Sequence, residues 1–223
     1  MAANLVYMAK SAWQDLLASI KTKAGYVGTL TASQAKTAVD SIQTGGGGGP
    51  DSYVAFEYNA NHLPVSAVVH GMSFIQERQF KGMATLEDVQ IDDTVHVIRA
   101  EAFINCGDLL ELKFPGAIND NIGSAAFRAC SYLEEIDMNT GPYATISANV
   151  FYGCFNLNTL ILRGSTMVTA SASSAFTNTG LSRGNGTVYV PQALITEYQE
   201  AANWSALYAA GTQFVAIEGS IYE

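Results

Sequence analysis

Charged side chains are scarce in this sequence. Only 14% of its 223 residues are Asp, Glu, Lys or Arg, and 11 basic residues against 20 acidic ones give a net charge of −9. A nucleic-acid-binding protein needs a clustered basic surface for the phosphates, and so does a protein that binds anionic lipid. The sequence has no such cluster, and it has no run of 18 apolar residues that would predict a membrane-spanning helix.

Targeting signals are missing as well. The first ten residues, MAANLVYMAK, lack the basic start and the long apolar stretch of a secretory signal, and no hydrophobic anchor follows at the other end. We therefore expect a protein that stays in the cell that makes it, leaves by lysis, or has lost a leader.

Five of the 20 glycines stand in a row, from Gly45 to Gly49, directly before Pro50. Five glycines in a row favour a flexible linker over any packed element. The charge changes at the same point, because residues 1–50 carry +2 and residues 51–223 carry −11. We predict a domain boundary, with a linker over residues 45–50.

Residues 1–44 have the pattern of a helical hairpin. Apolar residues recur every three or four positions, Gly25 can end a first helix, and Thr31 with Gln34 forms a capping-box pattern that can begin a second. The predicted docking face comprises Leu5, Trp13, Leu16, Ile20, Val39 and Ile42. So short a hairpin cannot bury this face alone, so it packs on its own second domain, on a partner chain or on copies of itself.

A repeat of constant length runs through the rest. Phenylalanines stand at positions 80, 103, 127, 151 and 176, and a fixed period of this size indicates a solenoid. The units that align on them are Ile98-x3-Ala-Phe-x2-Cys106-x2-Leu-x2-Leu-x-Phe114, Ile122-x3-Ala-Phe-x2-Cys130-x2-Leu-x2-Ile-x-Met138 and Ile146-x3-Val-Phe-x2-Cys154-x2-Leu-x2-Leu-x-Leu162. An earlier copy begins at Ile75, and the last, around Phe176, is degraded.

The end of each unit alternates apolar and polar residues, which predicts a short strand with one buried face. The expected fold is an α/β leucine-rich-repeat solenoid, with parallel strands stacked coil on coil and helical turns opposite. Its repeats span 75–186, and caps over 51–74 and 187–223 close the exposed ends.

The Ala-Phe, Cys and Leu-x-x-Leu-x-Leu elements, with Val188-Tyr-Val-Pro191, Tyr198 and Trp204 after them, resemble the BspA-type leucine-rich repeat over residues 75–217. The resemblance implies the solenoid fold and, in many members, binding or adhesion to host proteins. It implies no catalytic residues.

The N-terminal segment carries a second resemblance. Leu16 to Gly25, Leu30 to Gln34 and Ser41 to Gly45 are similar to the start of many phage and prophage tail or fibre proteins. Such proteins leave the cell by lysis and need no leader, and a helical docking adaptor suits them.

Catalytic and metal sites find little support. Cys106, Cys130 and Cys154 share one repeat position and are expected in the core as small apolar groups. The three histidines are scattered, and alternation places Glu135 and Asp137 both towards solvent, unlike a paired acid and base. We expect no cofactor, no metal and no enzyme activity.

The remaining candidate site is a surface, because alternation points one set of residues out of the sheet. This set is Asp88, Gln90, Asp92, Glu111, Lys113, Glu135, Asp137, Asn139, Thr159, Ile161 and Arg163. It is either a partner surface or merely a solvated face.

The sequence thus predicts a non-enzymatic structural or interaction protein, a phage or prophage virion component of the tail or fibre type. The alternative is a bacterial cell-surface adhesin of the BspA type without its export signal. We expect protein partners, assembly through residues 1–44, and a host surface protein or a glycan as target.

Overall fold

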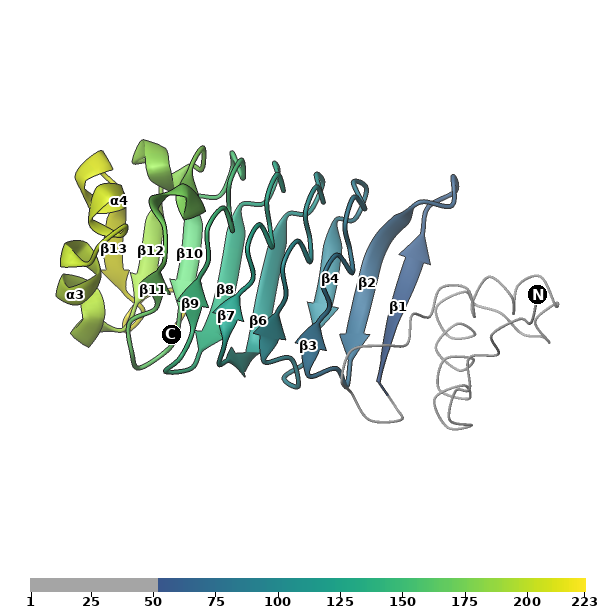
Figure 1. The fold of residues 1–223 in the computed structure, drawn as a ribbon, viewed down its shortest axis with the longest axis horizontal. Coiled ribbons are helices and arrows are strands. Elements are labelled where there is room, and N and C mark those ends of the chain that lie inside the picture. Colours follow the sequence, from purple (N-terminus) through teal and green to yellow (C-terminus); the bar gives the residue numbers. More distant parts are fainter. Residues whose placement is uncertain (1–51) are drawn as a thin grey trace.

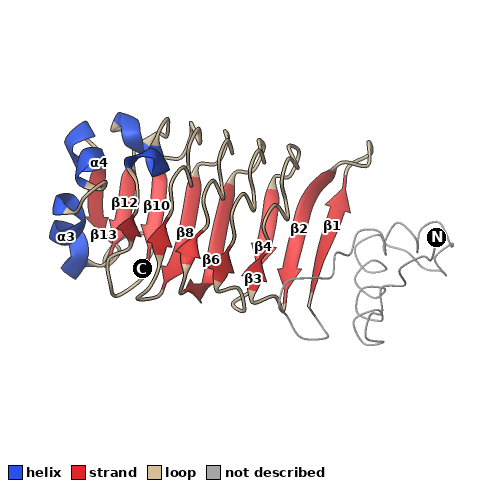
Figure 2. Cartoon of the chain, viewed as in Figure 1, coloured by secondary structure: helices blue, strands red, loops and turns tan. Residues whose placement is uncertain are grey.

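The computed structural model describes residues 52–223, and the predicted hairpin and linker lie outside the described residues. From Ser52 the chain winds as a solenoid in which each coil contributes one strand to a long layer (Figure 1). Strands dominate the described part, and helices gather at its C-terminal end (Figure 2). No helix in this part of the chain is long and apolar enough to cross a membrane.

The strands of the long layer are β1 (Tyr53–Tyr58), β2 (Pro64–His70), β4 (Asp88–Ile91), β6 (Glu111–Ile118), β8 (Glu135–Thr140), β10 (Thr159–Leu162), β12 (Thr187–Val190) and β13 (Gln213–Ala216). Shorter strands form a second line: β3 (Phe74–Ile75), β5 (Val97–Ile98), β7 (Asn121–Ile122), β9 (Thr145–Ile146) and β11 (Thr169–Ala170). The helical elements are η1 (Ser173–Phe176), η2 (Leu181–Arg183), η3 (Gln192–Leu194), α3 (Ile195–Glu200) and α4 (Ser205–Ala210).

The pairing register follows the sequence repeat. Strands β6, β8, β10, β12 and β13 pair in parallel, and one buried row of side chains crosses all five. That row is Leu112, Ile136, Leu160, Val188 and Phe214. The predicted solenoid of mostly parallel strands is therefore confirmed. The pair β1–β2 at the N-terminal end is antiparallel, and it joins β4 through β2.

The turns opposite the long layer alternate between local and coil-to-coil hydrogen bonds. The Phe103 amide donates to the carbonyl of Ala126 in the next coil at 2.7 Å, whereas the Cys106 amide donates back to Phe103 at 3.1 Å. Left-handed residues such as Ala125 and Ala129, with φ of 57° and 61°, interrupt any helix. The expected helical turns are thus single 3₁₀-type turns, and only η1 and η2, at the end of the repeats, extend into short helices.

The repeat phenylalanines stack into one continuous column. Ring centroids from Phe80 through Phe103, Phe127 and Phe151 to Phe176 lie 4.7, 5.3, 5.6 and 5.6 Å apart in turn, all in stacked orientation. Each such pair contributes roughly 0.5–1.5 kcal/mol beyond simple burial. The column ends on Phe56 at one side and on Trp204 at the other, so both terminal segments are tied to the core.

Side chains of the C-terminal helical segment form hydrogen bonds with the exposed backbone groups of the last coil. The Tyr198 hydroxyl accepts a hydrogen bond from the Val168 amide, and the Trp204 indole donates to the Val168 carbonyl, both at 2.8 Å. Asn203 donates to the Ala170 carbonyl at 2.8 Å. These side chains take the positions that the backbone of a further coil would occupy, which is how a solenoid end is closed.

Candidate binding face

We call the side of β4, β6, β8 and β10 that points away from the core the outer sheet face. The structure leaves Asp88, Gln90, Glu111 and Lys113 exposed, and it leaves Asp92, Glu135, Asn139, Thr159 and Arg163 partly exposed. Two of the predicted outward residues are buried instead: Asp137 is 5% exposed and Ile161 is 0% exposed. The expectation that Glu135 and Asp137 both face solvent was therefore wrong at Asp137, and Ile161 of the predicted outward set is covered as well.

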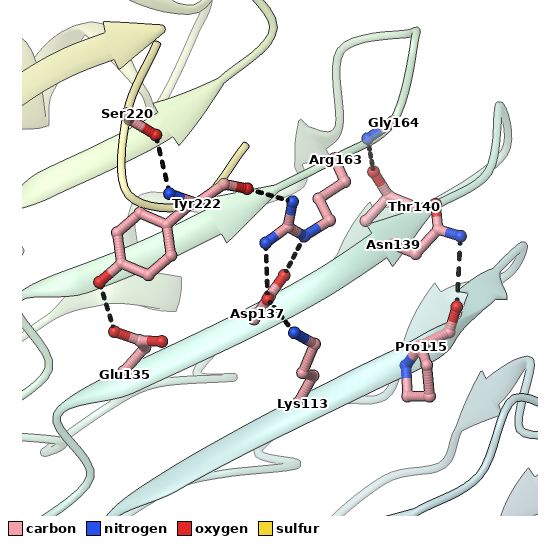
Figure 3. Close-up of polar contacts among 10 residues, drawn as sticks. All are labelled: Lys113, Pro115, Glu135, Asp137, Asn139, Thr140, Arg163, Gly164, Ser220 and Tyr222. Atoms are coloured by element: carbon pink, nitrogen blue, oxygen red, sulfur yellow. Dashed lines mark hydrogen bonds and ion pairs between the residues drawn. The ribbon is translucent and has the colours of Figure 1, made fainter. Parts of the chain in front are cut away.

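The cause is a return of the chain across this face. Residues 220–223, which we call the tail, lie over β8, β10 and β12 (Figure 3). The ring of Tyr222 packs on Tyr189 with centroids 4.7 Å apart, and its hydroxyl donates to Glu135 at 2.6 Å. Ile161 lies in register between Asp137 and Tyr189, so the tail shields it from solvent.

Asp137 is the centre of the charge network beneath the tail. Arg163 donates to both of its carboxylate oxygens, Nε to Oδ1 at 2.6 Å and Nη2 to Oδ2 at 2.9 Å. Lys113 Nζ lies 3.3 Å from Oδ2. Arg163 Nη1 also donates to the Tyr222 carbonyl at 2.6 Å, so one guanidinium connects the sheet to the tail (Figure 3). The bidentate geometry makes this the strongest type of ion pair.

The titration of these groups reflects their surroundings. Hydrogen bonding to Asp137 raises the pKa of Arg163 above its usual value, which secures its positive charge. Burial, together with the hydrogen bond to Glu135, raises the pKa of the Tyr222 phenol, so the hydroxyl remains protonated and continues to donate. The tail is thus held by a guanidinium that stays charged and a phenol that stays protonated near neutral pH.

A smaller polar cluster lies where β4 ends. Asp92 accepts hydrogen bonds from the Gly71 amide at 2.7 Å and from Thr94, and His70 Nδ1 lies 2.9 Å from its Oδ2. Burial favours the neutral form of Asp92, but the hydrogen bonds outweigh it and lower the pKa of this carboxyl. Gly71 directly follows β2 and Thr94 lies after β4, so the cluster holds the loop after β2 against the loop after β4.

The three cysteines lie fully buried with free thiols. Each Sγ donates to the carbonyl of a repeat phenylalanine in the preceding coil, at 3.0, 3.0 and 2.9 Å. The neighbouring thiol and burial raise the pKa of Cys106, and burial raises that of Cys130. Low thiolate content and no access make both poor nucleophiles. Among residues 52–223, no group of three His, Cys, Asp or Glu side chains could hold a metal ion.

Two open hollows lie on the outer sheet face. The first, about 590 Å³, is lined by β4, β6, Glu135, Asp137 and Arg163, with Ile221, Tyr222 and Glu223 of the tail as its far wall. The second, about 660 Å³, lies around the starts of the same strands, with Glu87, Leu110 and Glu134 in its lining. Asp88, Glu111 and Glu135 line both hollows, so the two form one groove, which we call the outer groove.

Repeating coils, a buried column of equivalent side chains and an open sheet face define a leucine-rich-repeat solenoid. The sequence matches the BspA type leucine-rich repeat region in six copies over residues 55–187, more than half of the chain. The chain therefore belongs to this family. The match begins earlier and ends earlier than the sequence-based resemblance at 75–217, because the β1–β2 hairpin is included and the C-terminal cap is not. No curated protein and no solved structure matches the chain.

Proposed function

We propose that this chain is a non-enzymatic interaction protein whose solenoid presents the outer sheet face to a protein partner. Leucine-rich-repeat domains generally mediate protein–protein interaction or adhesion, which supports the proposal. The observation that carries it is a contrast between the two faces of the sheet. Equivalent inner positions such as Val89, Leu112, Ile136 and Leu160 are uniformly apolar and buried, whereas equivalent outer positions change in character from coil to coil, as in Gln90, Lys113, Asp137 and Ile161.

The polar groups of the face are engaged in ways that support binding over catalysis. Asp137 is neutralised by Arg163 and Lys113, and Glu135 accepts the hydroxyl of Tyr222. Because both carboxylates are already engaged by neighbouring side chains, neither is placed to act as a general acid or base on a substrate. The thiols lie in the core, where a substrate cannot reach them.

For the biological setting, the proposal is a phage or prophage virion component of the tail or fibre type. Its support is the N-terminal resemblance to tail and fibre proteins, in residues outside the described part of the chain. In that setting, residues 1–44 attach the chain to the particle and the solenoid faces outward. The second candidate is a cell-surface adhesin, and the BspA-type family favours it.

A location experiment separates the two settings. The strain that carries the gene is induced to lyse, particles are isolated by density gradient, and intact cells are shaved with protease in parallel. The virion proposal expects peptides of this chain in the particle band and none among the shaved peptides. If the chain is a cell-surface adhesin, the protease should release its peptides from intact cells and the particle band should lack them. A cytoplasmic enzyme serves as the marker for leakage from the cells. Absence from both fractions would contradict both settings.

The assembly role of the hairpin has its own test in the full chain. Light scattering should report a defined oligomer, and Leu16→Asp or Ile20→Asp on the predicted docking face should reduce it to a folded monomer. Ser11→Asp, outside that face, is the matched control. A full chain that is already monomeric would count against self-association and leave two roles for residues 1–44, packing on their own second domain or docking on a foreign partner.

A further inference from the structure

The outer groove is half occupied. The tail covers β8, β10 and β12, while the part above β4 and β6 is open and bordered by the tail. The covered half shows which contacts this sheet face can make with a peptide segment. It holds a short peptide segment through a main-chain carbonyl on Arg163, a phenol on Glu135 and an aromatic contact with Tyr189.

A row of acidic side chains in the outer groove forms no ion pair with any described cation. Glu111 and Glu135 stand opposite each other in the register of β6 and β8, and Asp88 holds the equivalent position on β4. Like charges at paired positions of neighbouring strands destabilise a sheet. Within residues 52–223 no ion pair reaches Asp88 or Glu111, because both nearby cations contact Asp137 instead.

The tail also offers the open half an apolar edge. Ile221 is 90% exposed, although it stands between the well-anchored Ser220 and Tyr222. It forms part of the wall of the hollow that Asp88, Glu111 and Pro115 line. An acidic floor beside an apolar wall favours a partner that combines cationic side chains with aliphatic ones.

We propose that the open half of the outer groove binds an extended, lysine- or arginine-bearing segment of a partner protein, lying across β4 and β6 beside the tail. The inference rests on the proposed function, that the solenoid binds a protein. Charge complementarity selects the basic segment, since a polyanion would be repelled. A bound metal ion is a poorer fit, because the described carboxylates do not converge on a point.

The test uses the full chain and a defined probe. A fluorescein-labelled octapeptide, Lys-Ser-Lys-Val-Lys-Ser-Lys-Val, is titrated by fluorescence anisotropy at about 50 mM NaCl, where charge attraction is weakly screened. The double variant Asp88→Asn/Glu111→Gln should weaken binding roughly five- to tenfold, since each exposed ion pair contributes modestly. The matched control is Glu197→Gln/Glu200→Gln on α3, which changes the net charge equally but lies away from the outer groove.

Each result supports or overturns the proposal. Selective loss in the β4–β6 variant, with the control unchanged, supports it, as does failure of the same peptide with Glu in place of Lys. Equal losses in both double variants would mean that only net charge matters, and equal binding by the acidic peptide would remove the basis of the inference. No binding by the wild-type chain up to about 1 mM would overturn it too.

The location experiment uses no basic peptide, so the two proposals fail separately. If the chain is found in particles or on cells but does not bind the basic peptide, only the proposal of a binding site in the outer groove is refuted. A chain found in neither place refutes the setting, whatever the peptide does.

Discussion

Burial, and not the number of ionic partners, should decide how much each acidic residue stabilises this solenoid. The chain offers a matched comparison. Asp137 contacts Arg163 and Lys113, and Glu101 contacts Arg78 and Lys81, so each carboxylate has one arginine and one lysine partner. The side chain of Asp137 is 7% exposed, whereas that of Glu101 is 27% exposed.

We expect Asp137→Asn to lower the free energy of unfolding by about 2–3 kcal/mol. A hydrogen bond to a charged group contributes roughly 1.5–3 kcal/mol, and breaking a fully buried ion pair costs about 3–5 kcal/mol. Arg163 keeps part of its side chain in water, which holds the loss below that upper range. For a domain of this size the melting temperature should fall by roughly 5–10 °C. Glu101→Gln should cost far less, because solvent screens its pairs.

Urea unfolding followed by circular dichroism, at low and at high salt, checks the comparison. High salt should erase the small effect of Glu101→Gln and leave most of the effect of Asp137→Asn, since salt screens exposed pairs much more than buried ones. Equal losses for the two variants, or a loss at Asp137 that vanishes at high salt, would refute the reasoning.

Three further outcomes follow from the packing and the titration. Phe127→Ala should cost about 3–5 kcal/mol in urea unfolding, because its ring is fully buried between two stacked neighbours, and Phe56→Ala at the column end should cost less. Gly123→Ala should destabilise strongly in the same assay, since an added Cβ would collide with the Ala100 amide nitrogen, a backbone atom that cannot move aside. The arginine and lysine beside Glu101 lower its pKa to about 2. The contribution of Glu101 to the free energy of unfolding is therefore complete above its ordinary pKa of about 4.5, and it is lost as the pH falls from there to about 2. The difference in stability between wild type and Glu101→Gln should shrink across that pH range.

The repeat itself could be predicted in detail because every coil obeys the same local rule. The inner positions that align in the sequence, such as Leu112, Ile136 and Leu160, are the ones that pair in register. A period of constant length and an alternation of two suffice for this result, since each coil packs only on its neighbours. The same alternation correctly left Asp88 and Glu111 in solvent.

The covered part of the face could not be predicted, because its cause lies outside the repeat. Alternation says which side of a strand a residue occupies but not what later packs on that side. The tail comes after the last repeat and has no periodicity, so its sequence does not predict that Tyr222 packs on Tyr189 and reaches Glu135. An apolar residue at an outer position, Ile161 beside Tyr189, was the one local signal that something covers this region.

The two ends of the solenoid are closed in different ways, and this difference determines which half of the face is available. At the N-terminal end, β1 extends the sheet edge in its own plane and leaves the outer sheet face open. At the C-terminal end, α3 and α4 close the last coil, and the chain then returns over the face as far as Glu135 on β8. Under the proposed function, the surface left open to a partner is therefore the half over β4 and β6, where outer side chains can change without touching the phenylalanine column. A partner could be exchanged for another by changing a few exposed residues, at almost no cost to the stability of the fold.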